Sequence, residues 1–231
     1  MQRELEVGLG LVGLAAQIGR QVQSGMTVGR WDKDDRSPVT VADLAIQAVI
    51  SAGLAQAFPE VPLMGEEGTE ELSRPEFAPL VAEIVQQVSD VWQRQGKREP
   101  VLNPQAPVTA ENVLRWIDRG RQGVNLQGRY WVLDPVDGTK GFLRKEQYAI
   151  ALALIENGRI LAGILGCPNL PDRMTLEHGS GSEATSDLRS PTGLAYMAVA
   201  GQGAQVVPLT AEPAISQAQS VVERRNTIPI L

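Results

Sequence analysis

The residues best suited to chemistry lie in one short stretch, Trp131–Phe142, with the sequence WVLDPVDGTKGF. Asp134 and Asp137 follow an apolar, β-branched run that predicts a buried strand, and Pro135 disfavours the helical conformation at Asp134. A tight turn here would present two carboxylates in one direction, beside glycines whose backbone N–H groups can approach an anion closely. Carboxylate ligands next to such N–H groups are what Mg²⁺-assisted phosphoryl chemistry needs.

The same residues have a simpler explanation, because Asp, Pro and Gly are the usual formers of surface turns. The apolar strand before the turn and the Thr, Gly and Phe residues after it favour the functional interpretation. The stretch resembles the DP[IV]DGT signature of the lithium-sensitive, Mg²⁺-dependent phosphomonoesterases, the family of inositol monophosphatase and fructose-1,6-bisphosphatase.

The continuation TKGFLRKEQYAIALALIENG resembles the 3′(2′),5′-bisphosphate nucleotidase branch of that family. Inositol monophosphatases usually carry an Asn-Phe pair where this chain has Gly141-Phe142. Three other segments are similar to the nucleotidase branch: SPVTVAD at 37–43, GEE at 65–67 and GCPNL at 166–170.

The resemblance implies a role for each candidate residue. It implies a Mg²⁺ site whose ligands are the side chains of Glu66, Asp134 and Asp137 and the main-chain carbonyl of Val136. It further implies that Asp43 and Thr139 orient and deprotonate the attacking water, and that backbone N–H groups at Gly138 and Thr139 bind the phosphate.

Two of these residues also have structural explanations. Thr40 and Asp43 fit the N-cap and N3 positions of a T-x-x-D capping box at the start of a helix that stops before Pro59. A Glu-Glu pair such as Glu66-Glu67 is most often a solvated loop tip. Both alternatives stay open at the level of the sequence.

The composition excludes several classes of protein. With 231 residues, 43% of them hydrophobic and 21% charged, the chain resembles an ordinary soluble globular protein, and a net charge of −6 argues against binding to a nucleic-acid polymer. One histidine, His178, cannot build a histidine-rich metal site, and one cysteine, Cys167, excludes an internal disulfide and is expected to be a packed interior thiol. No apolar run reaches about 18 residues, so no membrane span is expected. These features, with no signal-peptide pattern, predict a soluble cytoplasmic protein.

The elements that must position the candidate residues are predicted from periodicity. Helices are expected over about the first two dozen residues, from Thr40 to before Pro59, around 80–92, and from a Thr109 N-cap to a C′ glycine at Gly120. Strands at 148–155 and 159–166 form a hairpin around Asn157-Gly158, and a second hairpin joins 194–200 to 205–209. Alternate alanines at 149, 151 and 153 suggest a helix packed closely on that face of the sheet.

The predicted fold class is α/β, in an α+β layered arrangement of helices on a mostly antiparallel sheet, as the resemblance to the sugar-phosphatase fold implies. We expect residues 1–170 to form a metal- and phosphate-binding domain and 171–231 to begin a second α/β domain that is incomplete. The resemblance implies a further aspartate in that second domain, and the sequence has no aspartate after Asp187.

The implied activity is removal of the 3′-phosphate of adenosine 3′,5′-bisphosphate to give AMP, a reaction linked to sulfate assimilation. The partner would then be a small phosphorylated nucleotide and the cofactor Mg²⁺. Two alternatives are an inositol monophosphatase-like activity on a sugar phosphate and a truncated, non-catalytic relative that binds metal.

Overall fold

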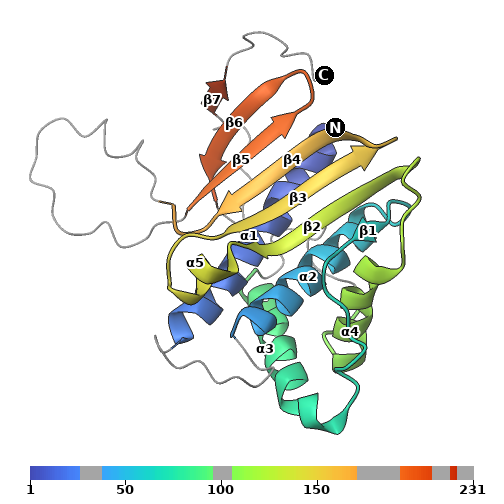
Figure 1. Ribbon diagram of the computed structural model, residues 1–231, viewed down its shortest axis with the longest axis vertical. Helices are drawn as coiled ribbons and strands as arrows, with labels where there is room; N and C mark the ends of the chain where they lie inside the picture. Colours follow the sequence, from blue (N-terminus) through green and yellow to red (C-terminus); the bar gives the residue numbers. More distant parts are fainter. Residues whose placement is uncertain (27–37, 96–105, 171–192, 210–218, 223–231) are drawn as a thin grey trace, which may run out of the picture.

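The computed structural model describes residues 1–26, 38–95, 106–170, 193–209 and 219–222 (Figure 1). The helical elements are α1 (Gln2–Gly25), α2 (Pro38–Ala57), η1 (Pro75–Phe77), α3 (Ala78–Gln95), α4 (Ala110–Asp118), η2 (Arg119–Arg121) and α5 (Thr139–Leu143). The strands are β1 (Leu63–Met64), β2 (Arg129–Asp137), β3 (Ala149–Glu156), β4 (Arg159–Cys167), β5 (Leu194–Val199), β6 (Gly203–Pro208) and β7 (Gln219–Val222).

The strands form one seven-stranded sheet in the order of the chain, β1 to β7. Strand β1 runs parallel to β2, and every other neighbouring pair is antiparallel. The prediction of helices on a mostly antiparallel sheet is therefore confirmed. Strands β5 to β7 follow residue 170 and extend the same sheet, and the division of the chain into two domains there stays a prediction.

The hairpin between β3 and β4 has the predicted turn. Asn157 and Gly158 have positive φ values of 51° and 71°, as a two-residue type I′ turn requires. The second predicted hairpin is also present, between β5 and β6. Its loop begins at Ala200, and Gly201 there has a φ of 74°.

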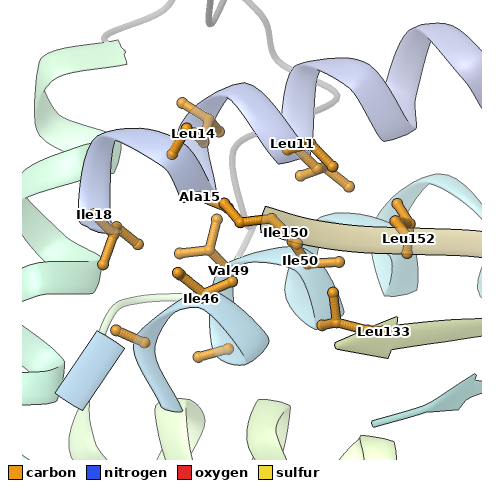
Figure 2. Packing of buried hydrophobic residues seen from close by; sticks show 14 of the residues in the cluster. Leu11, Leu14, Ala15, Ile18, Ile46, Val49, Ile50, Leu133, Ile150 and Leu152 are labelled. Atoms are coloured by element: carbon orange, nitrogen blue, oxygen red, sulfur yellow. The ribbon is translucent and has the colours of Figure 1, made fainter. Parts of the chain in front are cut away.

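Helices α1 and α2 cover one face of the sheet (Figure 1). Leu11, Leu14 and Ile18 of α1 meet Ile46 and Ile50 of α2 above the side chains of the central strands (Figure 2). The covered residues of β3 are Ile150, Leu152 and Leu154, each at most 1% exposed. This layer holds the main apolar core.

The alanines of β3 lie on the opposite face of the sheet from this core. Ala149, Ala151 and Ala153 are half-buried and alternate with the fully buried residues that the helices cover. The expectation that the alanine face packs against a helix was wrong for the helices that the structure describes. Small residues are compatible with a closely packed neighbour, but in β3 the helices cover the opposite face, which carries the larger apolar side chains.

The predicted helices are present, with corrections at their ends. Thr109 is the N-cap of α4, and its hydroxyl accepts a hydrogen bond from the Asn112 N–H at 3.2 Å. Helix α2 already begins at Pro38, so Thr40 lies within the helix and is not its N-cap. The fixed φ of proline suits the first turn of a helix, which explains the earlier start.

Gly120 occupies the predicted C′ position of α4, directly after the C-cap Arg119, but it lacks the positive φ typical of a C′ glycine and lies within η2. Cys167 is 7% exposed, as expected of an interior thiol, and burial raises its pKa. His178 lies outside the described residues. None of the helices in the described part of the chain has the length and apolar character needed to cross a membrane.

Candidate active site

The two parallel strands bring the acidic candidates to one edge of the sheet. Leu63 pairs with Trp131 and Met64 with Val132, so the end of β1 lies beside the middle of β2. Glu66 lies two residues beyond Met64, and Asp134 lies two residues beyond Val132. Because the carboxyl ends of parallel strands meet at one edge, these two carboxylates come together.

The Asp-Pro-Val-Asp sequence lies at an irregularity in β2. The strand does not end at Leu133 but continues to Asp137, and the register shifts between Asp134, which is opposite Ala151, and Asp137, which is opposite Ala149. Three steps on β2 match two on β3, which is the signature of a β-bulge. Directly opposed residues share a face, so the bulge puts both aspartates on the alanine side of the sheet. The prediction that they point in one direction is supported by this register.

The bulge leads directly into the short helix α5. Gly138 precedes it with a φ of 90°, a left-handed conformation that favours glycine, and Thr139 is the first helical residue. Both residues are exposed, and the Phe142 N–H donates to the Gly138 carbonyl at 3.0 Å. The first backbone N–H groups of a helix have no partner within it, so those at this end are available to a ligand.

Helix α2 contributes Asp43 to the same region. The pKa of Asp43 is raised from 3.8 to about 8, first by burial and then by the charges of the Glu67, Glu66 and Asp134 carboxylates. Burial also raises the pKa of Glu67, as does Glu66 beside it. These mutual effects define an acidic cluster of five residues, namely Asp43, Glu66, Glu67, Asp134 and Asp137.

Asp134 lies at the centre of this cluster. Its pKa is raised by burial and by the charges of Glu66 and Asp137, while a hydrogen bond from the backbone of Val136 lowers it. Asp134 is thus linked electrostatically to residues from the loop after β1, from β2 and from α2. The structure brings together all the acidic residues that the sequence singled out, with Glu67 as an additional member.

Hard oxygen donors with unbalanced negative charge are the kind of ligands that divalent cations such as Mg²⁺ prefer. In the described residues, no three acidic, histidine or cysteine side chains already form a ligand set. The two observations agree physically, because charge repulsion acts over longer distances than a coordination bond and keeps the carboxylates apart. The residues fit a divalent cation by donor type and charge.

No sequence pattern predicted the residues that bind the acidic loop after β1. Arg121 of η2 donates to the Glu66 carbonyl at 3.3 Å and lowers the pKa of Glu67. The Asp118 carboxylate accepts hydrogen bonds from the Thr69 N–H at 3.0 Å and from its hydroxyl at 2.5 Å. Neither contact follows from a local motif, since the partners lie about 50 residues apart in the chain.

Comparison with known proteins gives a consistent result. The family model described as "Inositol monophosphatase family" matches residues 5–227. The 3′(2′),5′-bisphosphate nucleotidase 1 of Candida albicans (strain WO-1) is 36% identical over 235 residues, which cover 99% of this chain and 61% of that protein. The 3′,5′-bisphosphate nucleotidase AHL of Arabidopsis thaliana is 38% identical over 177 residues, which cover 74% of this chain and 47% of that protein.

Among solved structures, CysQ from Bacteroides thetaiotaomicron, described as a bacterial member of the inositol monophosphatase family, shares the fold. Its TM-score is 0.52 at 17% identity, over 98% of this chain and 60% of that chain. The chain therefore spans about three fifths or less of the length of these relatives. The resemblance that the DPVDGT stretch predicted is confirmed, and the chain belongs to the inositol monophosphatase family.

Proposed function

We propose that this chain carries the catalytic centre of a metal-dependent phosphatase that removes the 3′-phosphate of adenosine 3′,5′-bisphosphate to give AMP. The observation that supports the proposal is the acidic cluster, which gathers carboxylates from α2, from the loop after β1 and from β2. Support for the substrate comes from the relatives named bisphosphate nucleotidases.

The acidic cluster is the proposed metal site. Members of this family are in general metal-dependent phosphatases. We assign Mg²⁺ to four ligands: the carboxylates of Glu66, Asp134 and Asp137 and the main-chain carbonyl of Val136. A divalent cation bound there supplies positive charge that stabilises the negative charge developing on the phosphoryl group.

Asp43 and Thr139 are the proposed water-activating pair. Contacts between α2 and α5 bring the two elements that carry them together. The Asp43 carboxylate interacts with the proposed ligands Glu66 and Asp134 and is the group that accepts the proton of the water. The Thr139 hydroxyl orients the water toward Asp43. The backbone N–H groups of Gly138 and Thr139 bind the phosphate.

Gly141 favours a nucleotidase over an inositol monophosphatase. A Cβ atom at this position would collide with the Gln147 carbonyl, so the loop after α5 is built on a glycine. The family resemblance noted in the sequence implies an asparagine at this position in inositol monophosphatases. Turnover of a sugar phosphate remains the second candidate activity, and the same assay separates the two.

The proposal further places the reaction in the cytoplasm and in sulfate assimilation, with a small phosphorylated nucleotide as the partner. The two-domain division at residue 170 is part of the same proposal. In it, residues 1–170 provide every metal and phosphate ligand assigned above.

The test is phosphate release from adenosine 3′,5′-bisphosphate and from inositol 1-phosphate, each with Mg²⁺ and then with added Li⁺. We expect lithium-sensitive release from the nucleotide and at least about tenfold less from the inositol phosphate. Asp134→Asn should reduce release by more than about a hundredfold, because it removes a metal ligand. Glu83→Gln, which removes one exposed carboxylate from α3, is the charge-matched control and should leave release unchanged.

Two results would contradict the proposal. Phosphate release that is unchanged in Asp134→Asn would show that the acidic cluster takes no part in the reaction. Absence of release by a folded wild-type chain, on both substrates, would leave a non-catalytic member of the family.

A further inference from the structure

We propose that Gln47 is a positioning residue that fixes the Glu66-Glu67 segment of the acidic cluster against helix α2. The inference rests on the proposed metal site and goes beyond it, because Gln47 is itself neither a ligand nor a proton acceptor in that site. It lies one helical turn beyond Asp43, so the two side chains leave α2 on neighbouring positions of one face.

The carboxamide of Gln47 binds both main-chain polar groups of one residue of the acidic loop, Glu67. Its Oε1 accepts a hydrogen bond from the Glu67 N–H at 3.0 Å, and its Nε2 donates to the Glu67 carbonyl at 2.8 Å. A second donation from Nε2 reaches the Ile117 carbonyl of α4 at 2.9 Å. Gln47 therefore connects α2, α4 and the loop that carries two of the five acidic residues.

Because Gln47 is buried, loss of its hydrogen bonds would be costly. Gln47 is 0% exposed, and both of its Nε2 donors and its Oε1 acceptor have partners. Water cannot replace a lost partner readily at such a position, so an apolar side chain would leave two groups of Glu67 unpaired. A buried amide that is fully satisfied specifies a single arrangement of its neighbours.

Two glycines leave room for the carboxamide. A Cβ atom at Gly65 would lie 2.5 Å from Gln47 Oε1, and one at Gly120 would lie 2.9 Å from Nε2 and 3.1 Å from the Gly65 Cα atom. The Gly65 N–H also donates to the Gly120 carbonyl at 2.9 Å. The backbone of the loop therefore approaches Gln47 at Gly65 and again at Glu67, on either side of Glu66.

The position of Glu66 follows from these constraints. Its peptide neighbours are fixed on both sides, and its own carbonyl accepts a hydrogen bond from Arg121. Like charges on Asp43, Asp134 and Glu67 would otherwise push the loop away from α2. A neutral amide holds the segment without adding a charge that would compete with a bound cation.

The test compares Gln47→Met, a change of similar volume that removes all three hydrogen bonds, with Ser51→Ala as the matched control. Ser51 lies one turn further along α2, is 0% exposed, and its hydroxyl has no hydrogen-bond partner among the described residues. Gln47→Asn is the second variant, because it keeps an amide that is too short to reach the loop.

Two measurements are made on each variant. Amide hydrogen exchange at Glu67, in the metal-free chain, measures directly how well Gln47 protects the Glu67 N–H. Calorimetric titration with Mn²⁺ measures the affinity of the metal site. We expect Gln47→Met and Gln47→Asn to weaken Mn²⁺ binding by about 10- to 100-fold, as is typical when a residue that positions the metal ligands is lost. Exchange at Glu67 should accelerate by at least about tenfold in both, with Ser51→Ala unchanged in both measurements.

The possible failures are distinguishable. Mn²⁺ affinity and Glu67 exchange within about twofold of wild type, in whichever Gln47 variant folds, would overturn the role of Gln47. A folded wild-type chain that binds no Mn²⁺ would overturn the metal site and thus the proposed function. In that case the exchange data alone would still show whether Gln47 holds the loop.

Discussion

Replacing Asp43 by asparagine should stabilise the metal-free chain at alkaline pH. The pKa of Asp43 is raised from 3.8 to about 8, first by burial and then by the charges of Glu67, Glu66 and Asp134. Asparagine has nearly the same shape as the carboxyl and never ionises, so it removes the repulsion while it keeps the packing. The substitution that abolishes a proposed catalytic group is thus expected to strengthen the fold.

The sign follows from proton linkage. A carboxyl whose pKa is higher in the folded than in the unfolded chain binds more protons when folded. Its contribution to stability is fully present below the unfolded value of 3.8 and is lost as the pH rises through the folded value of about 8. At about 1.4 kcal/mol per pH unit, the loss across this window is at most about 6 kcal/mol. For a chain of this size, that corresponds to a melting temperature gap of about 12 to 24 °C.

The assay is thermal unfolding of wild type and Asp43→Asn in the presence of a chelator, from about pH 4 to about pH 9. We expect the two melting temperatures to converge at the acidic end and to separate progressively up to pH 8, with the variant higher. Glu83→Gln removes an exposed carboxylate on α3, and the melting temperature of this variant should equal that of wild type at every pH. A gap that is constant with pH, or a variant that melts below wild type at pH 8, would refute the proposed electrostatic arrangement.

Two further predictions concern local structure. Gly141→Ala should lower phosphate release by at least about tenfold, because a Cβ atom would meet the Gln147 carbonyl and displace the loop after α5; steady-state kinetics check this, and unchanged kinetics would contradict it. Thr109→Ala should lower the free energy of unfolding by about 1 kcal/mol through loss of the N-cap hydrogen bond to Asn112; urea unfolding measures this, and a loss well below half that value would show that the cap contributes little.

Local patterns predicted the elements well because each depends on neighbours in the sequence. Helical periodicity found α1, α3 and α4, and the Asn157-Gly158 pair identified the β3–β4 turn. The DPVDGT stretch identified the family because strand, bulge and helix start are encoded within a dozen residues. The proposed roles of its residues remain predictions.

Contacts between distant residues could not be predicted in the same way. Gln47 reads as an ordinary polar position on a helix, and only the fold places its amide on Glu67 and Ile117, 20 and 70 residues away. Gly120 resembled a helix terminator because the sequence cannot show that Gly65 passes close to it. The bulge at Pro135 was likewise not expected, since a turn and a bulge use the same residues.

The acidic cluster requires a frame that resists its own repulsion, and the core supplies one. The repulsion and burial at Asp43 oppose folding by at most about 6 kcal/mol, whereas a fully buried Leu or Ile side chain contributes about 1.5 to 3 kcal/mol. Helix α2 places Ile46, Ile50 and Leu54 in the core, each at 0% exposure. Burial of these three side chains is of the same size as the electrostatic penalty, and the other core residues of α2 add to it, so the helix stays in place when Asp43 ionises. Rearrangement is then left to the exposed side chains of the cluster, Glu66 and Asp137, which we propose as ligands of the cation.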